Sequence, residues 1–199
     1  MRKGDYMLHN RVNKVQELAI ASIMVAMAAV LSFFDKSISV IAFPFLPVAK
    51  IGLANIVILL AIYIFDFKTS LLITVLKSVV VGLILGSISS FIIGASASLV
   101  SFFWMFLAHK LLKDKTSLVG ISVIGGFLHI VTQLFVVMLI YHTGDAVFKS
   151  GALLVLISLV TSIIVGIAGN GLYKYLTIHY HLNSSLELVS EDKGENNEL

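Results

Sequence analysis

Long apolar segments constrain this chain more than any other feature. The sequence of 199 residues is 58% hydrophobic and only 13% charged, and its mean hydropathy of +1.01 is far above that of a soluble domain of this size. A helix needs about 20 mostly apolar residues to cross the roughly 30 Å hydrocarbon core of a bilayer. The sequence therefore predicts a polytopic membrane protein of the all-α class.

Six apolar stretches are candidates for membrane-spanning helices, and we expect them to form a six-transmembrane-helix bundle. The second and third are short for a full span, so a count of five is also open. The candidates are residues 18–34, 51–65, 71–85, 90–107, 118–141 and 151–175. This division leaves a basic N-terminal segment (1–17), a membrane domain (18–176) and a polar tail (177–199), which we expect to be disordered.

Basic residues are distributed unevenly between the two sides of the predicted bundle. If the N-terminus lies in the cytoplasm, nine lysine and arginine residues fall on the cytoplasmic side, whereas only Lys36, Lys50 and Lys149 fall on the outer side. Cytoplasmic segments of membrane proteins carry the excess of such residues. We therefore expect a multi-pass plasma-membrane protein with both termini in the cytoplasm.

Lys77 is the residue whose position most needs a functional reason. It lies within the apolar run 71–85, and no acidic residue is near it in sequence. A charged side chain at the bilayer centre costs about 2.5–3.5 kcal/mol on insertion-based scales, so such residues usually face the bundle interior and meet a polar group or a ligand. We interpret Lys77 as a binding residue for an anionic or strongly polar group. The alternative is that its ammonium group snorkels to the interface.

The last two spans carry polar residues at helical spacing. His129 and Gln133 lie one turn apart on one predicted helical face, so both side chains could hydrogen-bond the same ligand. Asn170 belongs to a similar stripe in the last span. The alternative is that these residues only hold helices together, since polar and small residues commonly do so in membrane bundles.

Two prolines, Pro44 and Pro47, mark the connection between the first two spans. Because proline interrupts regular helix, we expect an ordered loop near the outer face. Lys50 and Asn55 follow this loop, which would place both at the mouth of an outward-facing pocket. For Lys50 the alternative is a contact with lipid headgroups.

Several chemistries are excluded by what the chain lacks. Cysteine is absent, which removes thiolate metal sites and cysteine nucleophiles. No phosphate-binding loop motif is present, so the chain by itself is not expected to hydrolyse ATP. With the spans placed as above, every Asp and Glu lies at a span boundary or outside, which argues against a catalytic carboxylate pair, a metal site and proton coupling. We therefore expect no enzymatic activity, no catalytic residue and no cofactor.

Three stretches resemble the Gx transporter family, whose members are also labelled heptaprenyl diphosphate synthase component I. They are residues 49–57 (AKIGLANIV), residues 76–86 (LKSVVVGLILG), and residues 119–126 (VGISVIGG) with the following His129 and Gln133. The resemblance runs from about residue 18 to residue 175. It departs at Lys77, where arginine is expected; lysine keeps the charge but not the forked geometry of a guanidinium group.

That family is similar to the S components of energy-coupling factor (ECF) transporters. These are small six-helix membrane proteins that bind a vitamin or related compound from outside and rely on a coupling membrane subunit and ATPase subunits. The resemblance implies that the first helix docks on the coupling subunit through small residues. Ala19, Ser22, Ala26 and Ala29 would suit this role, although internal packing is the alternative.

The resemblance and the structural class together leave one preferred function and two alternatives. The preferred function is uptake of an isoprenoid, quinone-precursor or vitamin-like compound with a polar or anionic head. The alternatives are a non-catalytic accessory subunit of heptaprenyl diphosphate synthesis, as the label says, and a membrane anchor for a quinone or flavin electron-transfer assembly. No nucleic-acid partner is expected. The predicted substrate-binding residues are Lys50, Asn55, Lys77, His129, Gln133 and Asn170.

Overall fold

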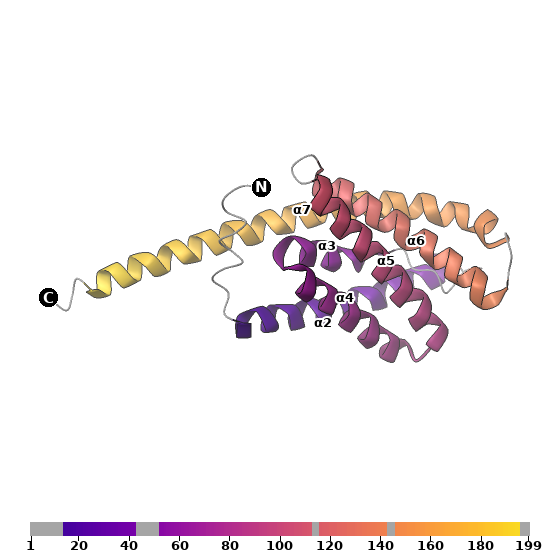
Figure 1. The fold of residues 1–199 in the computed structure, drawn as a ribbon, viewed down its shortest axis with the longest axis horizontal. Helices are drawn as coiled ribbons and strands as arrows, with labels where there is room; N and C mark the ends of the chain where they lie inside the picture. Colours follow the sequence, from indigo (N-terminus) through magenta and orange to yellow (C-terminus); the bar gives the residue numbers. More distant parts are fainter. Residues whose placement is uncertain (1–13, 43–51, 113–115, 143–145, 196–199) are drawn as a thin grey trace.

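The computed structural model describes residues 14–42, 52–112, 116–142 and 146–195, and all of its regular structure there is helical. Figure 1 shows the helices packed side by side, with α7 extending past the others. Five of the helices are long and apolar enough to cross a membrane, which indicates a multi-pass membrane protein. The helices are α2 (Lys14–Ala42), α3 (Asn55–Ile64), α4 (Phe67–Leu85), α5 (Ile88–Leu112), α6 (Leu118–Tyr141) and α7 (Ala146–Glu195).

The helix α3 is too short to cross a bilayer. Its ten residues span about 15 Å at 1.5 Å per residue, which is half of the hydrocarbon core. The all-helical fold is thus confirmed, whereas the prediction of six full spans is not. The helix α3 nevertheless contacts each of the other five described helices and buries most of its residues, including the run 57–62. It lies at the centre of the bundle.

Serine side chains join the three helices α5, α6 and α7. The Ser101 hydroxyl donates to the Gly125 carbonyl oxygen at 2.9 Å, the Ser122 hydroxyl donates to the Ser162 carbonyl oxygen at 2.7 Å, and the Ser158 hydroxyl donates to the Gly126 carbonyl oxygen at 3.1 Å. Glycine permits these close approaches, and hydroxyl groups bond across them because lipid offers no alternative partner. Ser101, Ser122 and Ser158 therefore serve helix packing.

The helix α2 packs mainly on α3 and α4, and it extends past its predicted end. The sequence placed this end at residue 34 because Asp35 and Lys36 follow, yet the helix continues to Ala42 and its apolar span runs from Glu17 to Ile41. Asp35 is only 2% exposed. The prediction that every acidic residue lies at or beyond a span boundary was therefore wrong. A charged residue can lie inside a span when its side chain faces the protein rather than lipid.

The helix α7 is also longer than predicted, with 50 residues. Its C-terminal part projects beyond the other helices (Figure 1). This part includes residues 177–195, for which the sequence predicted disorder. The segment contains no proline, and its leucine and glutamate residues favour helix, so the backbone can continue without a break.

Short capped turns set the other helix boundaries. The Asp66 carboxylate accepts a 3.1 Å hydrogen bond from the Thr69 backbone N–H and caps α4. Only Phe65 and Asp66 separate α3 from α4, so the two helices form a tight hairpin. The helix α6 matches the predicted span 118–141. The predicted proline loop lies outside the described residues.

Candidate functional site

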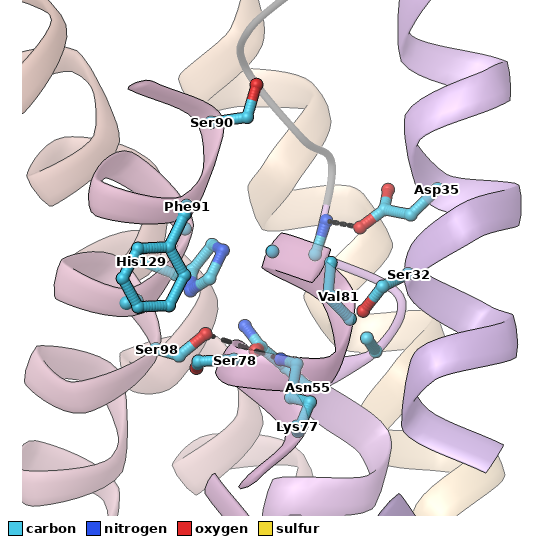
Figure 2. A pocket seen from close by; sticks show the side chains of 15 residues that line it. Ser32, Asp35, Asn55, Lys77, Ser78, Val81, Ser90, Phe91, Ser98 and His129 are labelled. Atoms are coloured by element: carbon cyan, nitrogen blue, oxygen red, sulfur yellow. Dashed lines mark hydrogen bonds between the residues drawn. The ribbon is translucent and has the colours of Figure 1, made fainter. Parts of the chain in front are cut away.

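A polar cavity lies between α2, the N-terminus of α3, α4, α5 and α6 (Figure 2). Its volume is about 20 Å³, which is room for about one water molecule. The cavity is therefore small, and a larger ligand requires its walls to move apart. Its lining consists of Ser32, Asp35, Gly52, Ala54, Asn55, Lys77, Ser78, Val81, Gly82, Ser90, Phe91, Gly94, Ala95, Ser98 and His129.

The cavity brings together three of the residues predicted from sequence to bind substrate. Asn55, Lys77 and His129 come from α3, α4 and α6, respectively, and all three line it. The three positions are separated by long stretches of sequence but become neighbours because the short α3 inserts between the longer helices. The arrangement unites hydrogen-bonding and charged groups from three different helices in one place.

Lys77 lies on the buried face of α4, together with Ser70, Thr74 and Ser78. Its ammonium Nζ donates a hydrogen bond to the Ser98 hydroxyl oxygen on α5 at 3.3 Å, as Figure 2 shows. The side chain is only 5% exposed, which is not the position of a lysine that snorkels to an interface. Lys77 therefore supplies positive charge to the interior of the bundle.

Asp35 supplies a negative charge to the same cavity. The sequence analysis did not predict it as a site residue. Its carboxylate Oδ2 accepts a 2.8 Å hydrogen bond from the Gly52 backbone N–H (Figure 2). Gly52 has a φ of +99°, a conformation that glycine adopts without strain. A signal for Asp35 was present in the sequence: Ser32, Asp35 and Ser39 recur at helical spacing and share the buried face of α2.

Asn55 has an unusual environment among the residues that line the cavity. It is 5% exposed, and among the described residues neither its amide oxygen nor its amide nitrogen has a hydrogen-bond partner. Asn55 is the first residue of α3 and does not cap it. The N-cap residue is Ala54, which makes no side-chain hydrogen bond to the helix N-terminus. A buried polar group without a partner costs about 1–3 kcal/mol. Such a group at a cavity wall is typical of a site that a ligand or water completes.

The other residues predicted to bind substrate lie outside the cavity or outside the described residues. Gln133 is fully buried on α6, one turn beyond His129, but it is not part of the lining. Asn170 is half-buried on α7 and does not line the cavity either. Lys50 lies outside the described residues. The geometry therefore groups His129, but not Gln133 or Asn170, with Asn55 and Lys77.

The residues predicted for partner docking fall mostly on the outer face of α2. Ala19, Ser22 and Ala26 are exposed, whereas Ala29 is buried. The opposite face of α2 packs into an apolar cluster with α3 and α4 that includes Ala21, Ala28 and Ile73 among others. The outer face is thus distinct from the face used for internal packing.

The described lining of the cavity combines hydrogen-bonding groups with charged groups. Hydroxyl, amide and imidazole groups and two charges of opposite sign surround a small volume. Among the described residues, no group of three or more His, Cys, Asp or Glu side chains could hold a metal ion. With one carboxylate in the described lining, the cavity holds no paired carboxylates for general acid–base catalysis.

The comparison with known protein families gives one match. The model of the family described as heptaprenyl diphosphate synthase component I matches residues 24–172. This range includes all of the residues that line the cavity. No curated protein and no solved structure matches the chain.

Proposed function

Because the chain belongs to the heptaprenyl diphosphate synthase component I family, the family that three sequence stretches predicted, we propose that it is the substrate-binding component of an ECF-type uptake transporter. The observation that carries the proposal is the Asn55 amide. It is buried without a hydrogen-bond partner in the part of the chain that the structure describes, and it lines a cavity together with Lys77 and His129. A polar ligand that enters this cavity would satisfy the amide and remove its energetic cost.

The position of the cavity along the helices supports capture from the outer side of the membrane. Its residues come from the C-terminal halves of α2 and α4, the N-terminal half of α5 and the first residue of α3. These parts belong to the same half of the bundle because the short α3 reverses the chain, so that α2 and α4 run in the same direction and α5 runs in the opposite one (Figure 1). With the N-terminus in the cytoplasm, as the distribution of basic residues predicts, this is the outer half. The chain is then a multi-pass plasma-membrane protein with cytoplasmic termini.

The proposed substrate is a compound with a polar head and an apolar or ring-bearing body, which includes isoprenoid, quinone-precursor and vitamin-like molecules. Lys77, Asn55 and His129 would contact its head. Phe91 lies at the cavity and is 37% exposed, so it would contact the body. Since the cavity holds about one water molecule in its present form, binding would require the helices that line it to move apart.

The proposed partners are a coupling membrane subunit and ATPase subunits of an ECF module. The sequence contains no phosphate-binding loop of its own, so energy would come from these partners. The exposed face of α2 with Ala19, Ser22 and Ala26 offers small side chains against which another membrane helix can pack closely.

The family label itself supports a second candidate function. As a membrane accessory subunit, the chain would hold a soluble prenyl diphosphate synthase at the bilayer and carry out no catalysis. In that case the partner would be this enzyme rather than ATPases. If the chain anchors an electron-transfer assembly, its partner would instead be a flavin or quinone enzyme.

Native mass spectrometry of the gently extracted protein, combined with identification of its co-purified proteins, separates these functions. We expect one small molecule bound per chain and ATPase subunits among the partners. An empty protein that brings down a soluble prenyl diphosphate synthase would replace the transport proposal with the accessory-subunit function.

The docking face can be tested in the same preparation. Ala26→Phe places a large ring on the exposed face of α2 and should reduce recovery of the ATPase subunits. Ala168→Phe, on the exposed face of α7, is the matched control and should leave recovery unchanged. Equal recovery with both variants would remove α2 as the docking helix.

A further inference from the structure

An open, largely apolar groove lies on the outside of the helix bundle, between the first residue of α4 and the C-terminal half of α5. It is lined by Phe67, Phe103, Phe106, Leu107 and Lys110. Its volume is about 600 Å³, which is within the range of about 300–1,000 Å³ that is usual for small-molecule sites. The groove shares no described lining residue with the polar cavity, so it is a separate candidate site.

Aromatic rings from two helices form the wall of the groove. The Phe67 ring of α4 lies edge-on to the Phe106 ring of α5, with 4.9 Å between the ring centroids, and 6.1 Å from the Phe103 ring. Phe102 is fully buried and lies 5.6 Å from Phe67. Rings that pack in this way hold one another in place. The wall is therefore preformed, and a ligand that binds to it loses little free energy in ordering these side chains.

The groove is apolar along most of its length and basic at one end. Phe103, Leu107 and Lys110 follow one another at spacings of four and three residues, so they share one face of α5. Phe103 is 49% exposed and Leu107 is 42% exposed, and Lys110 is exposed as well. At 1.5 Å per residue, Lys110 lies about 10 Å further along the helix than Phe103. An ammonium group thus stands at the end of an exposed apolar stripe.

This order of groups matches the depth profile of a membrane lipid. Lys110 is in the last turn of α5, where the apolar span ends at Leu112, whereas Phe103 lies deeper in the span. The Thr69 hydroxyl donates a 2.7 Å hydrogen bond to the Glu17 carboxylate, so this end of the bundle is the one at which α2 begins. In the proposed orientation it faces the cytoplasm. Basic residues at that boundary attract the anionic lipids of the inner leaflet.

We propose that an anionic phospholipid docks in this groove, with its phosphate bound to the Lys110 ammonium group and one acyl chain along Phe67, Phe103 and Leu107. The charge of Lys110 complements the headgroup, and its apolar stem can lie along the groove while the ammonium group stays at the interface. The proposal concerns a surface other than the substrate cavity and does not depend on which substrate the chain binds.

The first test measures lipid selectivity in the full-length protein after its native lipids have been removed with detergent. Phosphatidylglycerol, and separately phosphatidylcholine with the same acyl chains, is titrated and bound lipid is counted by native mass spectrometry. We expect one phosphatidylglycerol to bind at least about tenfold more tightly than phosphatidylcholine, and Lys110→Gln to abolish this preference. Lys174→Gln, at an exposed position of α7, is the matched control and should keep it. A wild type without preference, or an unchanged preference in Lys110→Gln, would overturn the proposal.

The second test fills the groove without changing any charge. Leu107→Trp should weaken binding of phosphatidylglycerol at least about threefold, because the larger side chain occupies the space of the acyl chain. Leu83→Trp, at a 77% exposed position of α4 outside the groove, is the control and should bind as wild type does. If Leu107→Trp binds lipid normally but loses a co-purified membrane protein, the groove holds a partner helix and the lipid proposal is wrong. Thermal unfolding of each variant verifies that it is folded.

Discussion

The Gly52 backbone N–H donates a 2.8 Å hydrogen bond to the Asp35 carboxylate and thereby joins α2 to the start of α3. The two residues are 17 positions apart in sequence. The bond holds a buried acidic side chain at the cavity and positions the N-terminus of the half-length helix. This hydrogen bond thus couples the position of α2 to the geometry of the proposed binding site.

The hydrogen bond between Asp35 and Gly52 predicts different effects for two substitutions of Asp35. Asp35→Ala leaves the buried Gly52 N–H without an acceptor and should lower the free energy of unfolding by about 1–3 kcal/mol. Asp35→Asn retains an acceptor and should lower it by less. Thermal unfolding in detergent measures both. Equal losses would show that the charge, rather than the hydrogen bond, stabilises this contact.

Asn55→Ala should separate stability from binding. Because the Asn55 amide has no hydrogen-bond partner within residues 52–112 or the other described ranges, its removal should change the unfolding free energy by less than about 1 kcal/mol, or raise it. Ligand retention, measured by native mass spectrometry, should be lost. Ser101→Ala is the contrasting variant: it removes the bond to the Gly125 carbonyl oxygen and should destabilise the bundle with retention unchanged. A strongly destabilised Asn55→Ala protein would assign the amide a structural role.

Lys77→Met should abolish ligand retention in a protein that remains folded. The methionine side chain fills similar apolar space but removes the charge that the ligand would meet, and a loss of at least about tenfold is expected. Lys110→Met, on an exposed position of α5, is the matched control and should retain the ligand. Retention by Lys77→Met equal to that of wild type would remove Lys77 from the binding site.

His129 and Gln133 should differ although they lie one turn apart on α6. His129 lines the cavity, so His129→Ala should weaken ligand retention. Gln133 is fully buried outside the lining, so Gln133→Ala should lower the unfolding temperature and affect retention less. Loss of retention without loss of stability in Gln133→Ala would mean that both side chains contact the ligand, as the sequence pattern first predicted.

A glycine-to-alanine substitution should have opposite effects on stability at two positions of α7. A Cβ atom at Gly166 would lie 2.6 Å from the Val119 Cα, so Gly166→Ala must push α6 and α7 apart and should cost about 1–3 kcal/mol. A Cβ atom at Gly171 would meet nothing within 4 Å. Gly171→Ala should therefore stabilise the helix by about 0.5–1 kcal/mol. Detergent unfolding curves compare the two, and equal stability would contradict the close approach of α6 and α7.

Sequence patterns predicted helix faces better than helix ends. His129 and Gln133 are buried together on α6, because residues four apart in a helix lie on one face. The ends of α2 and α7 were misplaced because a charged or polar residue was taken as the end of a helix. The helix backbone continues past such residues wherever their side chains have a polar environment to face.

The sequence by itself determined that the chain is all-helical, apolar and membrane-spanning. Long continuous apolar segments favour helix in lipid, because a helix satisfies its backbone polar groups within its own segment. Only the tertiary structure decided that α3 is a half-length helix at the centre, and that Asp35 lies in one cavity with Asn55, Lys77 and His129. Proximity between helices depends on how side chains of different segments pack against one another, and the periodicity within each segment does not encode that packing.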